Sequence, residues 1–205
     1  MNLAFYRFSR VLTYLYFKIY NRTSFRNQHL VPKNCPLIVP SNHCSHLDPP
    51  ILASLLMKRP ITFMAKKELF DQKLFGLLIT NLGAFPVDRG ASADKKAFVE
   101  TIRLLKEQRA VVIFPEGTRS SDGKLQKFQI GAARLAMTVE NCRILPVKID
   151  GSFKSLGGRS KFPKPCKISV RAGEPLDPSD FMSITDKKQR TEAITEELRK
   201  SISAL

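Results

Sequence analysis

From residue 36 onward, the sequence alternates between short apolar runs and longer segments with helical character. The apolar runs predict strands at residues 37–39, 61–65, 84–87, 110–114, 144–149 and 167–170. The segments between them predict helices near residues 48–58, 68–81, 92–108, 129–140 and 186–203. Strands separated by helices are typical of a layered domain. We therefore expect the fold class α/β, with a single layered domain whose mixed, mostly parallel sheet is flanked by helices.

Length and local spacing agree with this expectation. A chain of 205 residues is long enough for one globular domain with a substantial core. The segment 92–108 places Phe98, Ile102 and Leu105 at helical spacing, with Lys and Glu at other positions. Residues 151–166 are rich in Gly, Lys and Pro, and we expect them to form an exposed loop.

Near the N-terminus, a predicted helix over residues 3–22 separates basic from apolar side chains. The basic arc carries Arg7, Arg10, Lys18 and Arg22, and the apolar arc carries Phe5, Phe8, Leu12, Leu15, Tyr16 and Ile19. A helix that crosses a bilayer needs about 20 largely uncharged residues, so the basic residues argue against a span. We expect residues 1–26 to associate with a membrane, with apolar groups at the acyl boundary and basic groups at the headgroups. The alternative is that the apolar arc packs on the protein's own core.

The charge balance restricts the partners that suit this chain. With 34 Lys and Arg against 18 Asp and Glu, the formal net charge is +16 at pH 7. Such a chain is expected to bind nucleic acid, anionic lipid headgroups or phosphorylated small molecules. No Asp or Glu precedes Asp48, and the basic residues of this part are interleaved with aromatic ones. That combination favours lipid, and the sequence carries no recognised nucleic-acid signature.

The cysteines and histidines predict neither a disulfide scaffold nor a metal site. Cys35, Cys44, Cys142 and Cys166 are widely spaced without a C-x-x-C unit, which argues against a zinc ribbon or a redox motif. The three histidines are scattered, so we expect no metal. The N-terminus has neither an uncharged apolar region nor a small-residue cleavage site, so a reduced, cytoplasmic environment is expected.

The run 41–48, of sequence SNHCSHLD, brings an imidazole close to a carboxylate. His43 follows a predicted strand and precedes a predicted helix, where α/β enzymes commonly carry their chemistry. On a regular helix the spacing from His43 to Asp48 would point the two side chains about 140° apart. Pro49 and Pro50 suit a first helical turn, so His43 is expected to precede the helix and to pair with Asp48. Asp48 would then hold the tautomer that leaves the other ring nitrogen free as a base.

Other interpretations of this run stay open from the sequence. His43 and Asp48 are also compatible with capping of the helix and nothing more. His46 forms an H-x-D with Asp48 and is a rival base, although a supporting polar role is expected for it. Cys44 suggests an acyl-enzyme, but adjacent side chains diverge, so sharing the His43 base would need unusual geometry. We expect Cys44 to be a small, semi-buried residue.

A second run, FPEGTRS at residues 114–120, supplies an acid, a flexible glycine and a guanidinium. Glu116, Gly117 and Arg119 together suit the binding of a polar or phosphorylated substrate, because a guanidinium recognises phosphate with a planar fork of donors.

In this order, the two runs resemble the glycerolipid acyltransferase family, most closely the 1-acyl-sn-glycerol-3-phosphate acyltransferases. Four blocks carry the resemblance: NHCSHLD at 42–48, AKKEL at 65–69 leading to GAFPVDR at 83–89, FPEGTRS at 114–120, and LPV at 145–147. The third block is the most distinctive. The resemblance implies that residues 27–205 form an acyltransferase domain.

The resemblance also implies a reaction: a fatty acyl group moves from an acyl-CoA or acyl-carrier-protein thioester to the free hydroxyl of lysophosphatidate, giving phosphatidate in phospholipid synthesis. The catalytic residues carried over are His43 as general base and Asp48 as its orienting partner. The substrate-binding residues carried over are Lys66, Arg89, Glu116, Gly117, Thr118 and Arg119, with Lys127 as a weaker candidate. Arg89 and Arg119 match positions associated with the acceptor phosphate, and Glu116 and Gly117 would shape the pocket around the glycerol. The alternative for Arg89, Arg119 and Lys127 is a solvated surface charge.

The same resemblance sets expectations for partners and location. The expected partners are membrane lipids, lysophosphatidate and acyl-CoA or acyl-carrier protein, with no cofactor, no metal and no nucleic acid. The expected location is the cytoplasmic face of a membrane, as a peripheral or monotopic protein. Alternative acceptors are glycerol 3-phosphate or another lysolipid. The alternative of another class is a non-catalytic basic protein that binds membranes or nucleic acid.

Overall fold

The computed structural model describes residues 3–55, 59–87, 91–158 and 160–205. The helices are α1 (Leu3–Tyr20), α2 (Asp48–Leu55), α3 (Lys73–Asn81), α4 (Ala91–Lys106), α5 (Gly131–Thr138), α6 (Ser152–Leu156) and α7 (Lys187–Ala204). The strands are β1 (Ser24–Arg26), β2 (Leu37–Pro40), β3 (Ile61–Lys66), β4 (Ala84–Val87), β5 (Ala110–Ile113), β6 (Arg143–Ile144), β7 (Val147–Asp150) and β8 (Ser169–Ala172). Short 3₁₀ turns lie at Gln28–Leu30, Lys67–Leu69 and Pro178–Phe181.

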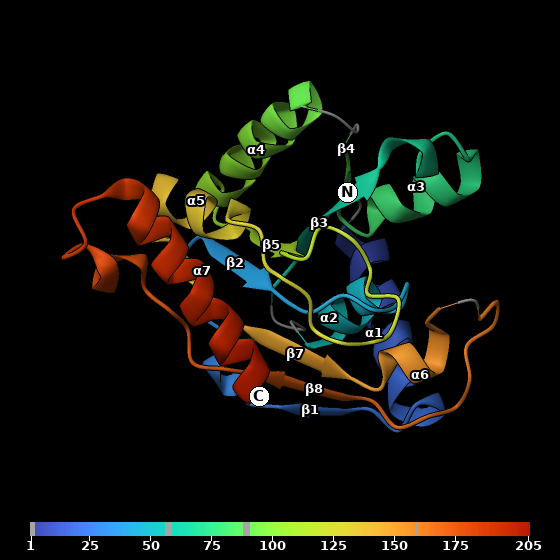
Figure 1. Cartoon of the computed structure of the whole chain (residues 1–205). Coiled ribbons are helices and arrows are strands. Elements are labelled where there is room, and N and C mark those ends of the chain that lie inside the picture. Colours follow the sequence, from blue (N-terminus) through green and yellow to red (C-terminus); the bar gives the residue numbers. More distant parts are fainter. Residues whose placement is uncertain (1–2, 56–58, 88–90, 159) are drawn as a thin grey trace.

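The main sheet has five strands in the order β4-β3-β5-β2-β6, and every neighbouring pair is parallel (Figure 1). Alternate residues of each central strand face opposite layers, as the period of a strand requires. In β2, Ile38 packs with residues of α4, α5 and α7, whereas Leu37 and Val39 pack with α2. Both faces of the sheet are therefore covered by helices, and the expected α/β fold class is confirmed.

A second sheet of three strands, in the order β1-β8-β7, lies beside the main one. β1 and β8 are parallel, whereas β7 and β8 are antiparallel, so the sheets taken together are mixed and mostly parallel. A single parallel bridge between Ser41 and Val147 joins the end of β2 to β7. The sequence did not predict β1, because a three-residue strand carries too few residues to show alternation.

The single strand predicted over residues 144–149 is wrong in one respect, because the chain divides there between the two sheets. Ile144 belongs to β6 and pairs with β2, whereas Val147 begins β7 in the second sheet. Between them, the Leu145 N–H donates to the Ile38 carbonyl at 2.8 Å. Pro146 follows, and it has no N–H with which to continue the ladder. The proline therefore lies where the chain changes sheets.

Helix α1 packs on α2 with a face that the sequence did not indicate. Its buried residues are Tyr6, Arg10 and Phe17, and the Ile61 N–H at the start of β3 donates to the Tyr6 hydroxyl at 2.8 Å. Arg10, which we expected at lipid headgroups, is buried instead, with its guanidinium 5.1 Å from the centre of the Tyr6 ring. A cation over an aromatic face is attracted by the ring quadrupole. This attraction accounts for a buried arginine in the contact.

The apolar arc predicted on this helix faces away from the core. All of its six members are exposed: Phe5, Phe8, Leu12, Leu15, Tyr16 and Ile19. Packing of this arc on the protein's own core, which was the alternative from the sequence, is not what the structure has. Among the described residues, no helix has the length and apolar character that crossing a membrane requires.

The segment predicted as an exposed loop over 151–166 contains helix α6, with Ser152 and Ser155 buried. The other described residues of the segment are irregular and are held by Asn21, which is fully buried just after α1. The Asn21 side-chain amide donates to the Ser155 hydroxyl at 3.1 Å and to the Cys166 carbonyl at 3.1 Å. The loop is therefore fixed against the end of α1 by a buried amide, a contact between residues far apart in the sequence.

Candidate active site

The blocks quoted from the sequence follow the carboxyl ends of neighbouring parallel strands. β2 and β5 are paired in register from Leu37 with Ala110 to Pro40 with Ile113, so the runs 41–48 and 114–120 leave the sheet side by side. β3 pairs with the other side of β5 and ends at Lys66. In open parallel sheets, the crevice at this edge is where ligands bind. The fold therefore gathers three blocks at one end of the sheet.

His43 and Asp48 are brought together as the sequence predicted. Nδ1 of His43 lies 2.8 Å from Oδ2 of Asp48. Asp48 is the first residue of α2 and is fully buried, so His43 precedes the helix and the two side chains can face each other. An ionised carboxylate only accepts hydrogen bonds, so the proton of the neutral imidazole sits on Nδ1. The Nε2 lone pair is left free to take a proton.

The same oxygen of Asp48 also organises the backbone of the run. Oδ2 accepts hydrogen bonds from the N–H groups of Cys44 and Ser45, each at 2.8 Å. The other oxygen, Oδ1, is buried without a hydrogen-bond partner among the described residues. Among the described residues, His46 makes no hydrogen bond to Asp48, and His46 is exposed. The carboxylate thus serves His43 and not His46, its rival from the sequence.

The run 114–120 holds His43 from three directions. The His43 N–H donates to Oε1 of Glu116 at 2.8 Å, and the His43 carbonyl accepts from the Ser120 N–H at 2.8 Å. The ring of Phe114 stacks on the imidazole, with centroids 3.9 Å apart and planes 16° from parallel. Backbone and ring are both fixed, so the imidazole has little freedom to turn.

Glu116 uses both carboxylate oxygens for backbone contacts. Oε2 accepts from the Gln126 N–H at 3.1 Å, while Oε1 holds the His43 N–H. Burial raises the pKa of Glu116 above its usual value, and the two N–H donors act in the opposite direction. Gly117 follows at φ 75°, a left-handed conformation that favours glycine, and its N–H closes the turn on the Phe114 carbonyl at 3.0 Å. A Cβ at Gly117 would lie 2.5 Å from the side chain of Gln129.

Positive groups lie around the imidazoles. Arg119 lies on the run that follows β5, Lys66 is the last residue of β3, and both are exposed. The pKa of His46 is lowered from its usual value, mainly by partial burial and next by the positive charge of Arg119, and Lys66 acts in the same direction. Both cations are therefore close enough to His46 to be felt electrostatically. A phosphate at this edge of the sheet would meet two basic side chains.

Cys44 has the environment of a structural thiol. It is buried, and its sulfur lies 3.2 Å from the Ser152 hydroxyl. Burial, and next the nearby Asp48 carboxylate, raise the pKa of Cys44 to about 11. The reactive thiolate is scarce at neutral pH under these conditions.

With this geometry in place, comparison with known proteins places the chain in a family. The model of the family described as Acyltransferase matches residues 22–150, which contain all four blocks. The chain belongs to the acyltransferase family.

Curated relatives agree with this assignment, and a solved structure shares the fold. The acyltransferase is 30% identical over 188 residues to the 1-acyl-sn-glycerol-3-phosphate acyltransferase of Bacillus subtilis, covering 92% of this chain and 87% of the relative. It is 32% identical over 197 residues to the protein of the same name from Streptococcus pneumoniae, covering 92% and 69%. The fold is shared with the crystal structure of the 1-acyl-sn-glycerophosphate acyltransferase PlsC from Thermotoga maritima. The TM-score is 0.78 at 24% identity, over 97% of this chain and 78% of that one. The predicted resemblance is confirmed.

The remaining site residues of the acyltransferase lie as follows. Thr118 is exposed in the same turn as Arg119, and Lys127 is exposed further along the connection to α5. Arg89, predicted to contact the acceptor phosphate, lies outside the residues that the structure describes. The structure thus brings Lys66 and Arg119 to the edge where His43 lies.

Sequence reasoning missed residues that support the base. Asn42 pairs with the backbone of β7: its amide N donates to the Ile149 carbonyl and its amide O accepts from the Ile149 N–H, each at 2.8 Å. Phe114 and Ser120 were seen only as members of a block, although each touches His43. Two signals were available in the sequence: Phe114 directly follows a buried strand, and Ser120 ends the block.

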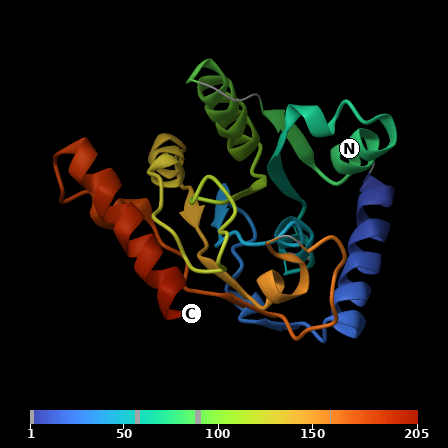
Figure 2. The same cartoon turned by 45° about the vertical axis from the view of Figure 1, so that its right-hand side comes forward.

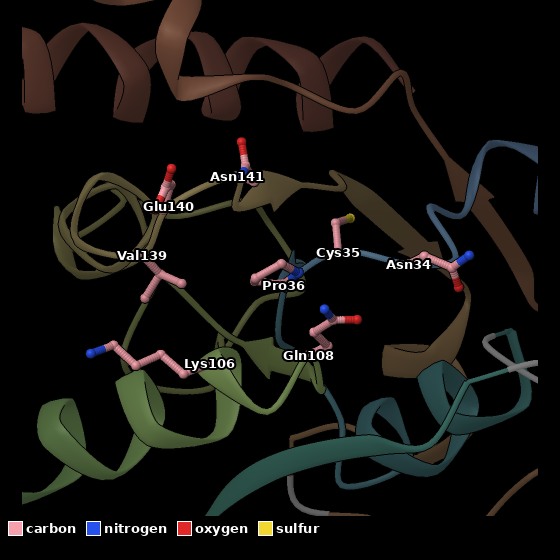
Figure 3. A pocket seen from close by; sticks show the side chains of 8 residues that line it. All are labelled: Asn34, Cys35, Pro36, Lys106, Gln108, Val139, Glu140 and Asn141. Atoms are coloured by element: carbon pink, nitrogen blue, oxygen red, sulfur yellow. The ribbon is translucent and has the colours of Figure 1, made fainter.

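Two pockets lie apart from the Nε2 side of the imidazole. A pocket of about 360 Å³ opens at the opposite end of the main sheet, before β2, β5 and β6 begin (Figure 3). Its lining residues are Asn34, Cys35, Pro36, Lys106, Gln108, Val139, Glu140 and Asn141. A smaller pocket of about 130 Å³ reaches Asn42 and Cys44 from the side of β7 and the end of α7. The larger pocket belongs to the other edge of the sheet and takes no part in the site.

Proposed function

We propose that this acyltransferase moves a fatty acyl group from a coenzyme A or acyl-carrier-protein thioester to the free hydroxyl of lysophosphatidate, giving phosphatidate. The observation that carries the proposal is the His43 imidazole with Nδ1 bound to the buried Asp48 and Nε2 free. The names of the two relatives described above support lysophosphatidate as the acceptor.

In this reaction His43 acts as general base. Nε2 takes the proton from the acceptor hydroxyl while the hydroxyl oxygen attacks the thioester carbonyl carbon. The new C–O bond forms, the C–S bond breaks, and the imidazolium returns its proton to the departing sulfur. Asp48 stabilises the imidazolium, and a positioned base of this kind typically contributes about 10²- to 10⁴-fold to the rate.

Transfer goes directly from donor to acceptor, without an acyl-enzyme on Cys44. The raised pKa of this thiol and its burial both disfavour nucleophilic attack. In this proposal the nucleophile is the acceptor hydroxyl itself. The order of events is therefore binding of both substrates, followed by a single transfer.

The acceptor phosphate binds to Arg119 and Lys66, with Arg89 as a third cation that the family pattern adds. Arg119 offers a planar fork of donors, and Lys66 offers a point charge. Both side chains are exposed and so are open to a ligand.

Glu116 acts as a positioning residue for His43. Each of its oxygens accepts a hydrogen bond from a backbone N–H, and through Oε1 the carboxylate fixes the backbone of His43. Its role here differs from the pocket-shaping role that the family resemblance suggested. Thr118 and Gly117 remain at the exposed turn beside Arg119.

The enzyme works at the cytoplasmic face of a membrane, with α1 lying in the interface. The exposed apolar arc of α1 supports this location, because it faces away from the core. Lysophosphatidate is an amphiphile held in such a surface, so a peripheral enzyme would meet its acceptor there.

The test is acyl transfer by purified protein in detergent. Oleoyl and palmitoyl thioesters of coenzyme A and of acyl-carrier protein are each offered with lysophosphatidate, glycerol 3-phosphate and lysophosphatidylcholine, with His43→Ala as control. We expect phosphatidate from lysophosphatidate alone, lost in the variant. Product with a different acceptor would change the assigned acceptor and leave the proposed acyl transfer in place. Equal product from His43→Ala would overturn the role of His43.

A further inference from the structure

Exposed apolar side chains extend beyond α1 to a second helix. In α3, Leu74 is 86% exposed, and Phe75, Leu77 and Leu78 are exposed as well. Gly76 holds this helix close to the preceding backbone, since a Cβ there would lie 2.4 Å from the Phe70 carbonyl oxygen. Four exposed apolar side chains on a nine-residue helix form a patch of the kind that marks an interaction site.

A third segment with an exposed apolar side chain is the loop 160–166. Phe162 is 78% exposed. The next residue, Pro163, accepts a hydrogen bond through its carbonyl from the Tyr20 hydroxyl of α1 at 2.9 Å. The side-chain amide of Asn21 donates a hydrogen bond to the Lys164 carbonyl at 3.3 Å. Phe162 is thus presented by a loop that is tied to the end of α1.

These three segments follow one edge of the molecule. Figure 2 shows α1 running along that edge, with α3 beside its first turns and the loop 160–166 beside its last ones. α1 packs against α3 and is bonded to the loop. The apolar residues at its far end include Ile19, which is 76% exposed. Segments distant in sequence therefore bring exposed apolar residues to one edge of the molecule.

The charges on these segments are mainly positive, although the exposed Glu68 and Asp71 lie just before α3. Residues 1–47, 73–87 and 151–173 contain no Asp or Glu. Exposed basic side chains lie beside the apolar ones: Lys18 and Arg22 near α1, Lys73 at the start of α3, and Lys161 and Lys164 on either side of Phe162. Aromatic and aliphatic groups bordered by Lys and Arg complement a bilayer whose headgroups are anionic. A second copy of this chain would bring two positive rims together, which opposes self-association through this face.

We propose that α1, α3 and the loop 160–166 form one composite surface that docks on an anionic lipid bilayer. This inference rests on the membrane location given under the proposed function and defines its contact surface. α1 lies along the bilayer plane, and α3 and Phe162 fix its two ends, so the protein docks in one orientation and does not roll about a single helix.

The test compares charge-neutral substitutions in each segment. Leu12→Gln in α1, Leu74→Gln in α3 and Phe162→Gln in the loop each remove an exposed apolar group. Met182→Gln, at a position 59% exposed beyond β8, is the matched control. Binding to vesicles of equimolar phosphatidylcholine and phosphatidylglycerol is measured by co-sedimentation. We expect each of the three variants to bind roughly tenfold more weakly, about 1.4 kcal/mol, and the control to bind like the unchanged protein.

The outcomes separate this inference from the proposed reaction. Acyl transfer in detergent is measured for every variant, and we expect it to be unchanged because none of the substitutions touches the site. If only Leu12→Gln weakens binding, α1 acts alone and the composite surface is wrong. If the unchanged protein stays in the supernatant yet is active in detergent, the membrane location fails and the reaction stands. A dimer without lipid that Leu74→Gln dissociates would assign the surface to a second copy.

Discussion

The backbone N–H of His43 donates a 2.8 Å hydrogen bond to Oε1 of Glu116, which joins two runs of the chain 73 residues apart. The bond is possible because β2 and β5 are parallel neighbours in register, so the residues that follow them emerge side by side. The Ser120 N–H closes the same contact from the other side of His43. The general base is therefore positioned by the loop of a neighbouring strand as well as by Asp48.

Replacing His43 by Ala should lower the turnover number roughly 10²- to 10⁴-fold, because the acceptor hydroxyl loses its base. Turnover with saturating thioester and lysophosphatidate measures this. His46→Ala is the matched control and should keep most of its turnover, since the Asp48 carboxylate is bound to the other imidazole. Equal losses in the two variants would contradict the assignment of His43. Circular dichroism checks that each variant is folded.

Glu116→Gln should lower kcat by more than about tenfold while the acceptor KM changes little. The amide has only one oxygen, so one of the two N–H donors loses its acceptor, and a hydrogen bond to a charged group is worth about 1.5–3 kcal/mol. Steady-state kinetics with varied lysophosphatidate separates the two parameters. A raised acceptor KM at unchanged kcat would instead indicate that Glu116 contributes to binding of the acceptor.

Arg119→Ala should raise the acceptor KM and leave the kinetics for the thioester nearly unchanged. A charged hydrogen bond to phosphate contributes about 1.5–3 kcal/mol, so an increase of roughly ten- to a hundredfold is expected. Lys124→Ala is the control, since Lys124 is a strongly exposed cation in the same connection. If both variants lose acceptor affinity alike, the effect is one of general charge and not of a specific contact.

Cys44 should resist alkylation in the folded protein at pH 8. With a pKa of about 11, only about one thiol in a thousand is ionised at that pH, and burial hinders access further. The rate should rise with pH toward that value. Peptide mass spectrometry after iodoacetamide treatment measures this, with the half-buried Cys35 and Cys166 as internal references. Cys44→Ala should retain activity, and an acyl group trapped on this sulfur would overturn direct transfer.

Arg59→Met should destabilise the fold by about 3 kcal/mol. The buried guanidinium donates to the carbonyls of Pro32, Cys35 and Gln108 at 2.6–2.8 Å, and the variant leaves all three without these donors. Thermal unfolding should show a Tm roughly 6–12 °C lower. Arg199→Met, at an exposed position on α7, is the control. A change in Tm no larger than that of the control would mean that the Arg59 guanidinium contributes little to the stability of the fold.

Much of the fold and of the candidate site followed from local patterns. Apolar runs and helical spacing predicted the five strands of the main sheet and the long helices, because buried faces impose their period on the sequence. Pro49 and Pro50 predicted that α2 begins after His43, and this start lets His43 face Asp48. Both inferences rest on residues close together in the chain.

Contacts between distant residues needed the tertiary structure. The sequence gives no sign that the carboxylate oxygens of Glu116 accept from the backbone N–H groups of His43 and Gln126. The pocket role that the family resemblance implies for Glu116 stays a prediction. The split at Pro146 depends on which sheet each flanking strand joins. α6 was missed because five residues show too little periodicity to be recognised.

The N-terminal helix has properties that the sequence determines and others that only the tertiary structure determines. The sequence by itself determined that α1 is amphipathic and basic, because these properties depend only on residue spacing. The tertiary structure decided that Tyr6, Arg10 and Phe17 meet the core while the apolar arc around Leu12 faces outward. The physical reason is that α1 packs on α2 and that the start of β3 donates a hydrogen bond to the Tyr6 hydroxyl. No pattern within one helix encodes its neighbour.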